Sequence, residues 1–168
     1  MDNHTLYVIP ARGGSKGIPG KNIKPLGGRP LIHYTIDIAR QLAPDSHIIV
    51  STDSEGIASV ARQTGLPVDY MRPAELATDT SGSREVIIDA MDWAASRGIA
   101  FDRVVLLQPT SPLRTVADVE ACLERYTPDA DMVVSVIPAK SNPYYNCFET
   151  DCATGLLHIS KGSGLYVR

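Results

Sequence analysis

The segment between positions 10 and 22 combines residue types that bind phosphate groups in many proteins. It reads PARGGSKGIPGKN and follows a short apolar run at positions 6–9. Its four glycines allow backbone N–H groups to approach an anion closely, and Arg12, Lys16 and Lys21 add three positive charges. This composition favours a polyphosphate-binding loop. The alternative is a basic, flexible surface loop.

The loop matches neither of the two common glycine-rich nucleotide motifs. Five residues separate Gly14 from Gly20, and Lys21 is followed by Asn22 rather than by Ser or Thr, so the Walker A pattern is absent. A G-x-G-x-x-G dinucleotide fingerprint is also missing from this segment. The kind of phosphate ligand therefore has to be inferred from the rest of the chain.

The elements that must position this loop alternate between strand and helix. We expect strands at 6–9, 47–50, 67–71, 104–107 and 132–137, and helices at 31–42, between 54 and 65, at 87–95 and at 116–126. The run at 104–107 is continuously apolar, as in a parallel strand that is buried on both faces. The pattern predicts an α/β fold with a three-layer, mostly parallel, doubly wound sheet. In such sheets, ligands bind outside the carboxyl ends of the strands.

The overall composition argues against several other functions. The 168 residues include 16 Lys+Arg and 19 Asp+Glu, a net charge of -3, whereas a nucleic-acid partner normally requires a basic excess. The longest apolar runs are too short for a membrane span, and the polar start of the sequence shows no signal peptide, so we expect a cytoplasmic protein. The three cysteines and four histidines have the spacing of neither a disulfide framework nor a metal site.

Four blocks of the sequence, in order, resemble the bacterial N-acylneuraminate cytidylyltransferases, the CMP-sialic acid synthetases. They are the segment from Ile9 to Asn22, then VSTD at 50–53, RPAELA at 72–77 and LLQPTSPLR at 106–114. The resemblance covers most of the chain and implies a Rossmann-like nucleotidyltransferase sheet. It also implies a reaction in which the anomeric hydroxyl of a nine-carbon sugar acid attacks the α-phosphorus of CTP, giving a CMP-sugar and pyrophosphate.

The resemblance assigns roles to individual residues. It implies catalytic roles for Arg12, Lys21 and Gln108, with Arg12 and Lys21 on the triphosphate and Gln108 beside the sugar. The residues implied to hold the nucleotide are Ala11, Arg12, Gly13, Ser15, Lys21, Asn22, Arg72, Ser81 and Ser83. Within that set, Arg72 and the segment around Ser81 and Ser83 correspond to the part that recognises cytosine and ribose.

Several of these positions also have purely structural interpretations. Ser81 and Ser83 could cap the helix that follows them, and we interpret Asp53 as a helix cap. Arg114 could bind the sugar carboxylate, but we favour a role in bracing its proline-containing loop.

The C-terminal part of the chain has a different pattern. Apolar residues at 144–148 and 156–159 flank the turn-like sequence TDCATG, which predicts an antiparallel hairpin. We divide the chain into a nucleotide-binding domain, 1–138, and the start of an arm, 139–168, which resembles the projecting β-hairpin through which family members form homodimers and donate sugar-site residues. Exposed apolar side chains such as Tyr144, Tyr145, Phe148 and Leu156 would need a partner to cover them.

The resemblance also implies Mg²⁺, but the metal ligands of the family are missing. Family members continue past this length into an Asn-Gly-x-Tyr sugar segment and an Asp-x-Asp metal pair. This sequence contains neither motif at a matching position. We therefore assign no metal ligand, and we interpret the chain as truncated relative to the family.

The sequence leaves both the sugar and the activity open. N-acetylneuraminic acid is the favoured substrate, and legionaminic and pseudaminic acids are close rivals. A CMP-Kdo synthetase is less favoured, because that family places an acidic residue where this chain has Pro109-Thr110. The chain could also be a CTP-binding fragment without turnover, or a nucleotidyltransferase that uses another base.

Overall fold

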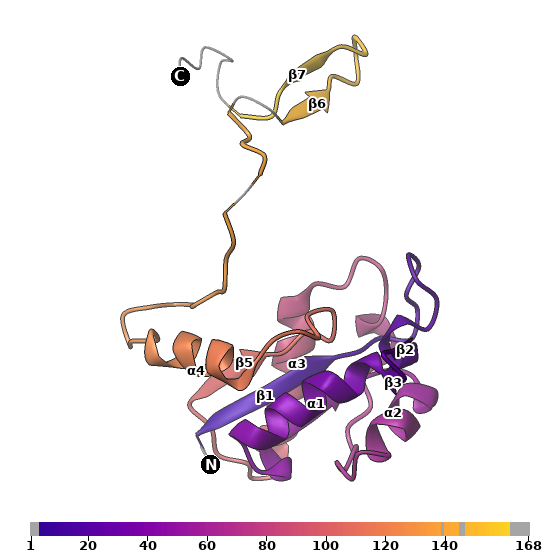
Figure 1. Ribbon diagram of the computed structural model, residues 1–168, viewed down its shortest axis with the longest axis vertical. Helices are drawn as coiled ribbons and strands as arrows, with labels where there is room; N and C mark the ends of the chain where they lie inside the picture. The colour runs from indigo at the N-terminus through magenta and orange to yellow at the C-terminus, as the bar shows by residue number, and fades with distance from the viewer. Residues whose placement is uncertain (1–3, 139, 145–146, 162–168) are drawn as a thin grey trace. The chain divides into compact units, whose positions relative to one another are not determined.

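The chain divides into two compact units, Met1–Glu124 and Arg125–Arg168, in a computed structural model that describes residues 4–138, 140–144 and 147–161 (Figure 1). The expected division between positions 138 and 139 stays a prediction about domains. The glycine-rich loop and the strands that carry it all belong to the first unit.

The first unit is built on a parallel sheet of three strands. They are β1 (Thr5–Pro10), β4 (Ile48–Ser51) and β5 (Arg103–Leu106), in the order β4-β1-β5. The register places Tyr7 of β1 between Ile48 of β4 and Val105 of β5. Because β1 is central and covered on both faces, it needs apolar side chains at consecutive positions, as its sequence provides.

Helices cover both faces of this sheet, which confirms the expected three-layer, mostly parallel α/β fold (Figure 1). Tyr7 and Ile9 of β1 pack in one core cluster with residues of α1 (Leu31–Leu42), α2 (Glu55–Arg62) and α4 (Val116–Glu124). The alternate residues Leu6 and Val8 pack in a second cluster with Ala90 and Ala94 of α3 (Ser83–Ser96). This alternation follows from the period of two along a strand.

Several short elements connect the main ones. They are η1 (Lys21–Ile23), β2 (Pro25–Leu26), β3 (Arg29–Pro30), η2 (Asp45–His47) and η3 (Ala74–Leu76). The pair β2–β3 is a small antiparallel hairpin that brings the chain from the glycine-rich loop into α1.

Side-chain caps define the starts of two helices, and one expected cap is wrong. Ser54 accepts a hydrogen bond from the Ile57 N–H and so caps α2, whereas the neighbouring Asp53 does not. At the start of α4, the Thr115 hydroxyl accepts from the Asp118 N–H, and the Asp118 carboxylate accepts from the Thr115 N–H at 2.8 Å. This reciprocal arrangement is a capping box, with Thr115 as the cap.

Helix α3 begins without the cap that the sequence offers. Its N-cap is Gly82, which has no side chain, and neither Ser81 nor Ser83 caps the helix. The capping interpretation of these two serines is therefore wrong.

Two expected strands are absent among the described residues. Residues 67–71 form no strand, although Val68 and Tyr70 are buried. Residues 132–137 form no strand either, and Met132 and Ile137 are 74% and 87% exposed. A strand is defined by hydrogen bonds to a neighbour, and an apolar run specifies the tendency to be buried but not the partner.

The second unit contains the expected antiparallel hairpin. Strand β6 (Phe148–Thr150) pairs with β7 (Leu157–Ile159), with Phe148 opposite Ile159. In the connecting turn, the Asp151 carboxylate accepts from the N–H groups of Ala153 and Thr154, and these bonds lower the pKa of Asp151. Of the arm, positions 139, 145–146 and 162–168 lie outside the described residues, and Tyr145, one of its expected exposed apolar residues, is among them. In the three described ranges, no helix is long and apolar enough to cross a bilayer.

Candidate functional site

A cavity of about 810 Å³ opens at the carboxyl ends of β1 and β5. Strand β4 lies on one side of β1, and β5, which follows later in the chain, lies on the other side. This reversal of strand order is the switch point at which doubly wound sheets bind ligands, and the cavity lies there. Its walls are formed by Pro10, Arg12, Ser15, Lys16, Gly17, Ile18, Lys21, Asn22, Arg72, Leu76, Thr78, Asp79, Ser81, Gly82, Ser83, Val86, Leu106, Gln108, Pro109 and Thr110. The cavity therefore has a basic side, formed by the glycine-rich loop, and a mixed polar and apolar side.

Eight of the predicted site residues lie on the walls of this one cavity, although they come from four separate segments. They are Arg12, Ser15, Lys21, Asn22, Arg72, Ser81, Ser83 and Gln108. Two others do not line it. Ala11 is fully buried in the core and donates its N–H to the Ser51 carbonyl at 2.8 Å, and the Gly13 N–H donates to Asp53.

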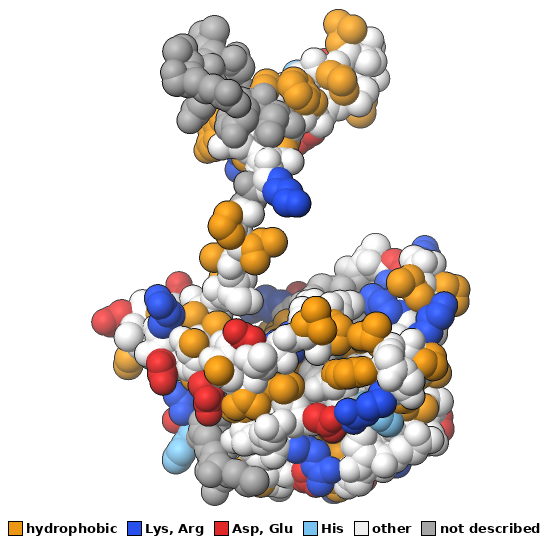
Figure 2. All heavy atoms as spheres, in the orientation of Figure 1, with side chains coloured by type: hydrophobic (Ala, Val, Ile, Leu, Met, Phe, Trp, Pro, Cys, Tyr) orange, Lys and Arg blue, Asp and Glu red, His pale blue; other side chains and the backbone are white. Residues whose placement is uncertain are grey.

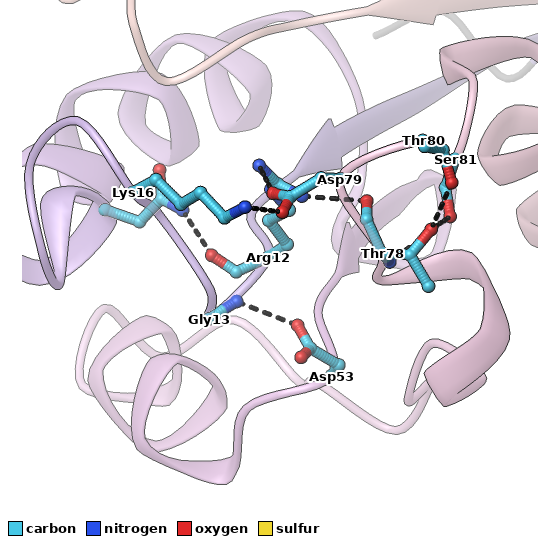
Figure 3. Close-up of polar contacts among 9 residues, drawn as sticks. Arg12, Gly13, Lys16, Asp53, Thr78, Asp79, Thr80 and Ser81 are labelled. Atoms are coloured by element: carbon cyan, nitrogen blue, oxygen red, sulfur yellow. Dashed lines mark hydrogen bonds and ion pairs between the residues drawn. The ribbon is translucent and has the colours of Figure 1, made fainter.

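The glycine-rich loop is held in place by two polar side chains. The Asp53 carboxylate accepts from the Gly13 N–H at 2.8 Å (Figure 3), and the buried Asn22 amide donates to the Arg12 carbonyl at 3.0 Å. A Cβ at Gly13 would lie 3.1 Å from the Cβ of Ser54, so a side chain at this position would require the start of α2 to give way slightly. Asn22 therefore positions the loop through the side chain that the resemblance assigned to the nucleotide.

Three cations of the loop reach the cavity, and they differ in their partners. Arg12 donates to the Thr78 carbonyl at 2.7 Å and forms an ion pair with Asp79 at 2.9 Å. Lys16 forms a second ion pair with the same carboxylate (Figure 3). Lys21 has no ion pair within the described part of the chain, so its charge is available to an anionic ligand.

Arg72 is a buried cation fixed to the end of β4. It is 7% exposed, and it donates from Nε to the Ser51 hydroxyl at 2.9 Å and from Nη2 to the Ser51 carbonyl at 2.7 Å. Burial lowers the pKa of Arg72, while the nearby Tyr70 and Asp53 oppose that effect. Nε and one N–H of Nη2 are used on Ser51, so three of the five guanidinium donors, including both of Nη1, are left for an acceptor on a ligand.

The segment 75–81 closes on itself through Ser81. Its hydroxyl donates to the Glu75 carbonyl at 3.1 Å, accepts from the Thr78 N–H at 3.2 Å and lies 2.7 Å from the Thr78 hydroxyl (Figure 3). These contacts occupy the Ser81 side chain within its own loop. Ser83, the first residue of α3, also lines the cavity, and it takes no part in the hydrogen bonds that Ser81 makes within the loop.

Gln108 enters the cavity from the loop after β5. Its side-chain oxygen accepts from the Thr110 hydroxyl at 3.4 Å, and its carbonyl accepts from Arg114 Nη2 at 3.3 Å. Arg114 does not line the cavity, and burial lowers its pKa. Its hydrogen bond to the loop backbone supports the bracing role that we favoured.

The described residues do not form a metal-binding cluster. No group of three or more His, Cys, Asp or Glu that could hold an ion occurs among them, and Asp79 is the one carboxylate on the cavity wall in that part of the chain. That carboxylate is already engaged by Arg12 and Lys16. Magnesium is normally held by one or two free carboxylates together with substrate phosphates. Because the Asp79 carboxylate is paired with two cations, the described residues as arranged do not fit a protein-held Mg²⁺. The Mg²⁺ that the resemblance implies stays a prediction.

Asp53 and Asp79 are the two site residues whose contacts the sequence did not reveal. Asp53 lies 40 positions from Gly13, and Asp79 lies 67 positions from Arg12. Such separations leave no local pattern to recognise. A general expectation that closely spaced cations attract a carboxylate was the one available signal.

Comparison with known proteins places this site in context. A family model described as "Cytidylyltransferase" matches residues 6–146. The chain is 45% identical over 138 residues to the CMP-N,N'-diacetyllegionaminic acid synthase of Legionella pneumophila, an alignment that covers 82% of this chain and 60% of that protein. It is 39% identical over 142 residues to the N-acylneuraminate cytidylyltransferase of Streptococcus agalactiae, covering 82% of this chain and 33% of that protein.

The structural comparison agrees with the sequence comparison. The fold is similar to a CMP:2-keto-3-deoxy-manno-octonic acid synthetase solved in complex with CTP, with a TM-score of 0.59 and 26% identity, covering 72% of this chain and 46% of that one. The aligned part of the chain thus spans less than two thirds of the length of each of these proteins.

Proposed function

Because the chain belongs to the cytidylyltransferase family, we propose that it couples CTP to a nonulosonic acid, giving a CMP-sugar and pyrophosphate. The observation that carries this proposal is the convergence of Arg12, Lys16 and Lys21 on one cavity with the buried Arg72. A triphosphate requires several cations, and a pyrimidine base requires fixed polar groups beside them.

In this proposal, the loop cations bind the phosphates and the rest of the cavity binds the nucleoside. Lys21 binds them without competition from a carboxylate in the described part of the chain, and Arg12 binds them from a loop that hydrogen bonds to Asp53 and Asn22 hold in place. Arg72 Nη1 and Ser83 lie where they can meet the acceptors of cytosine and ribose. The Ile18, Leu76 and Val86 side chains supply apolar surface for the base.

The chemical step exchanges one bond to phosphorus for another. The anomeric oxygen of the sugar acid forms a bond to the α-phosphorus of CTP, and the bond from that phosphorus to the oxygen bridging to the β-phosphate breaks. The electron pair leaves with pyrophosphate, and the hydroxyl proton passes to solvent. The chain contributes positioning and charge neutralisation, and Gln108 at the end of β5 is the group proposed to orient the sugar.

Two nonulosonic acids are supported about equally as the sugar substrate. The relative named for N,N'-diacetyllegionaminic acid is 45% identical and the one named for N-acylneuraminate is 39% identical, over similar lengths. N-acetylneuraminic acid, our expectation from the sequence, is therefore proposed beside legionaminic acid. Pseudaminic acid is retained as a third candidate.

A CTP-binding unit without turnover is the second candidate function. The specific observation that favours it is that Asp79, the one carboxylate on the cavity wall among the described residues, is already paired with Arg12 and Lys16. Measuring pyrophosphate release with Mg²⁺, CTP and each of the three sugar acids separates the two functions. Release with CTP and one acid supports catalysis, whereas CTP binding with no release from any pair supports the second candidate.

We also propose that the hairpin arm forms a homodimer. In the second unit, Phe148, Leu156 and Leu157 are 56%, 69% and 68% exposed, and apolar side chains are visible on its surface (Figure 2). Exposed groups of this size are normally covered by a partner. Sedimentation equilibrium at micromolar concentration should give twice the mass of one chain, and a monomer under these conditions would contradict the proposal.

A further inference from the structure

The Asp79 carboxylate occupies the position of an anion between two cations of the glycine-rich loop. One of its oxygens lies 2.9 Å from Arg12 Nη2, and the other contacts the Lys16 ammonium (Figure 3). Arg12 additionally holds the adjacent Thr78 carbonyl at 2.7 Å. The segment that carries Asp79 therefore supplies an internal ligand to the same groups that would bind phosphates.

The segment is shaped so that Asp79 is presented to these cations. Ser81 ties the Glu75 carbonyl to the backbone and hydroxyl of Thr78, which fixes the turn immediately before Asp79. The Lys16 and Arg12 contacts hold the pKa of Asp79 below its usual range, with Lys16 contributing most, so the carboxylate is charged at neutral pH. Its placement is thus a feature of the loop's own hydrogen bonding.

The ion pairs of Asp79 with Arg12 and Lys16 are weak enough for a ligand to replace the carboxylate. The Asp79 side chain is 43% exposed, and those of Arg12 and Lys16 are 32% and 80% exposed. Ion pairs exposed to this degree are weak, because water and salt screen the two charges from each other. A ligand that brings several negative charges can therefore replace the single carboxylate.

We propose that Asp79 competes with the triphosphate for Arg12 and Lys16, and thereby lowers the affinity of the cavity for polyphosphates. This inference rests on the proposed function, since it concerns the same site. When a triphosphate binds, Asp79 gives up both cations to it. After pyrophosphate has formed, the Asp79 carboxylate, which already contacts both cations in the ligand-free site, can recover them, and this favours release of the product.

The decisive comparison uses phosphate chains without a base. Isothermal titration calorimetry measures the dissociation constants of inorganic tripolyphosphate, pyrophosphate and CTP for the 168-residue chain and for Asp79→Asn. Removing the competing charge should tighten binding of all three by about 3- to 10-fold, the range expected for one or two partly exposed ion pairs. Asp79→Glu keeps the charge and should bind as the unchanged chain does.

A matched control removes the same charge elsewhere. Asp92 is an exposed residue of α3 that does not line the cavity, so Asp92→Asn changes the net charge equally without releasing Arg12 or Lys16. It should leave the three dissociation constants within about 1.5-fold of their original values, as expected for a distant, screened charge. Thermal unfolding of each variant verifies that it is folded.

The outcomes separate this inference from the proposed function. Unchanged or weaker tripolyphosphate binding in Asp79→Asn would overturn the inference, as would failure of both proteins to bind any polyphosphate. Tighter tripolyphosphate binding in Asp79→Asn, with CTP bound no better than UTP, ATP or GTP, would support the competition while contradicting the cytidylyl function. Tighter binding of CTP and tripolyphosphate together, with CTP preferred, supports both.

Discussion

Arg72 donates two hydrogen bonds to Ser51, the last residue of β4. The distances are 2.9 Å to the Ser51 hydroxyl and 2.7 Å to its carbonyl. Arg72 is buried, yet it still lines the cavity. The same side chain thus stabilises the strand end and presents a fixed donor to a ligand. This double role makes its removal costly in two separately measurable ways.

Replacing Arg72 with alanine should reduce both stability and CTP affinity. The variant removes two hydrogen bonds from the buried Ser51, whose carbonyl keeps the Ala11 N–H as a donor, and this should lower the free energy of unfolding by about 1–3 kcal/mol. Urea denaturation measures this loss. Arg84→Ala is the matched control, because Arg84 is exposed at the start of α3, and it should change the same free energy by no more than about 0.5 kcal/mol. Equal stability of the two variants would contradict the account of Arg72.

Removing the Asp53 carboxylate should loosen the glycine-rich loop. Asp53→Ala leaves the Gly13 N–H without its acceptor, so the amide should exchange faster with solvent, and tripolyphosphate should bind about 3- to 10-fold more weakly, as expected for the loss of one positioning hydrogen bond. Asp53→Asn keeps a carbonyl oxygen and should recover most of both properties. Hydrogen exchange and calorimetry report the two effects. If alanine and asparagine behave alike, the loop is not held through this bond.

Lys21 should contribute to phosphate binding without contributing to the fold. Since it has no internal ion pair in the described ranges, Lys21→Met removes one ligand contact, and CTP affinity should fall by about 10- to 100-fold, the range for a charge-assisted hydrogen bond. Lys24→Met is the control, because Lys24 is exposed nearby and does not line the cavity. Calorimetry with CTP compares them, and an equal loss from both would show only a general charge effect.

Tyr70 should ionise later than an ordinary tyrosine. Burial raises its pKa to about 12, and its hydrogen bond to Asp89 acts in the same direction. Because the pKa in the folded protein lies above that of the unfolded chain, the stability associated with neutral Tyr70 is fully present below about pH 10 and is lost as the pH rises toward 12.

Ultraviolet difference spectroscopy measures this titration directly. The spectrum of the chain minus that of Tyr70→Phe isolates one of the seven tyrosines, and its midpoint should lie well above 10. Asp89→Asn should move the midpoint downward, because the neighbouring negative charge is removed. A midpoint near 10 in the unchanged protein would contradict the burial of this side chain.

The sequence predicts the central part of the fold well, because burial on both faces leaves a clear signal. The consecutive apolar residues of β1 and the periodic apolar residues of α1 each have one stable arrangement, and both elements form as expected. The run at 132–137 has the same apolar character but pairs with no strand among the described residues. Apolarity indicates that a segment needs burial, and the pairing partner depends on tertiary contacts that a local pattern does not contain.

The sequence predicted which residues line the candidate site better than it predicted their hydrogen-bond and ion-pair partners. Arg12, Lys21, Arg72 and Gln108 meet at one cavity because the carboxyl ends of parallel strands lie at one edge of the sheet. Ala11 and Gly13 were implied to hold the nucleotide, but their backbone N–H groups already donate to Ser51 and Asp53. Hydrogen-bond satisfaction of the backbone is a property of the folded chain, so composition alone could not have revealed it.

The most direct test of the central claim is the nucleotide preference of the cavity. Equilibrium binding of CTP, UTP, ATP and GTP should be measured on the 168-residue chain and on Lys21→Met, with tripolyphosphate as a competitor. The account predicts that CTP binds more tightly than the other three, that Lys21→Met weakens it and that tripolyphosphate displaces it. Equal affinity for all four nucleotides, unaffected by Lys21→Met, would contradict the assignment of this cavity as a CTP site.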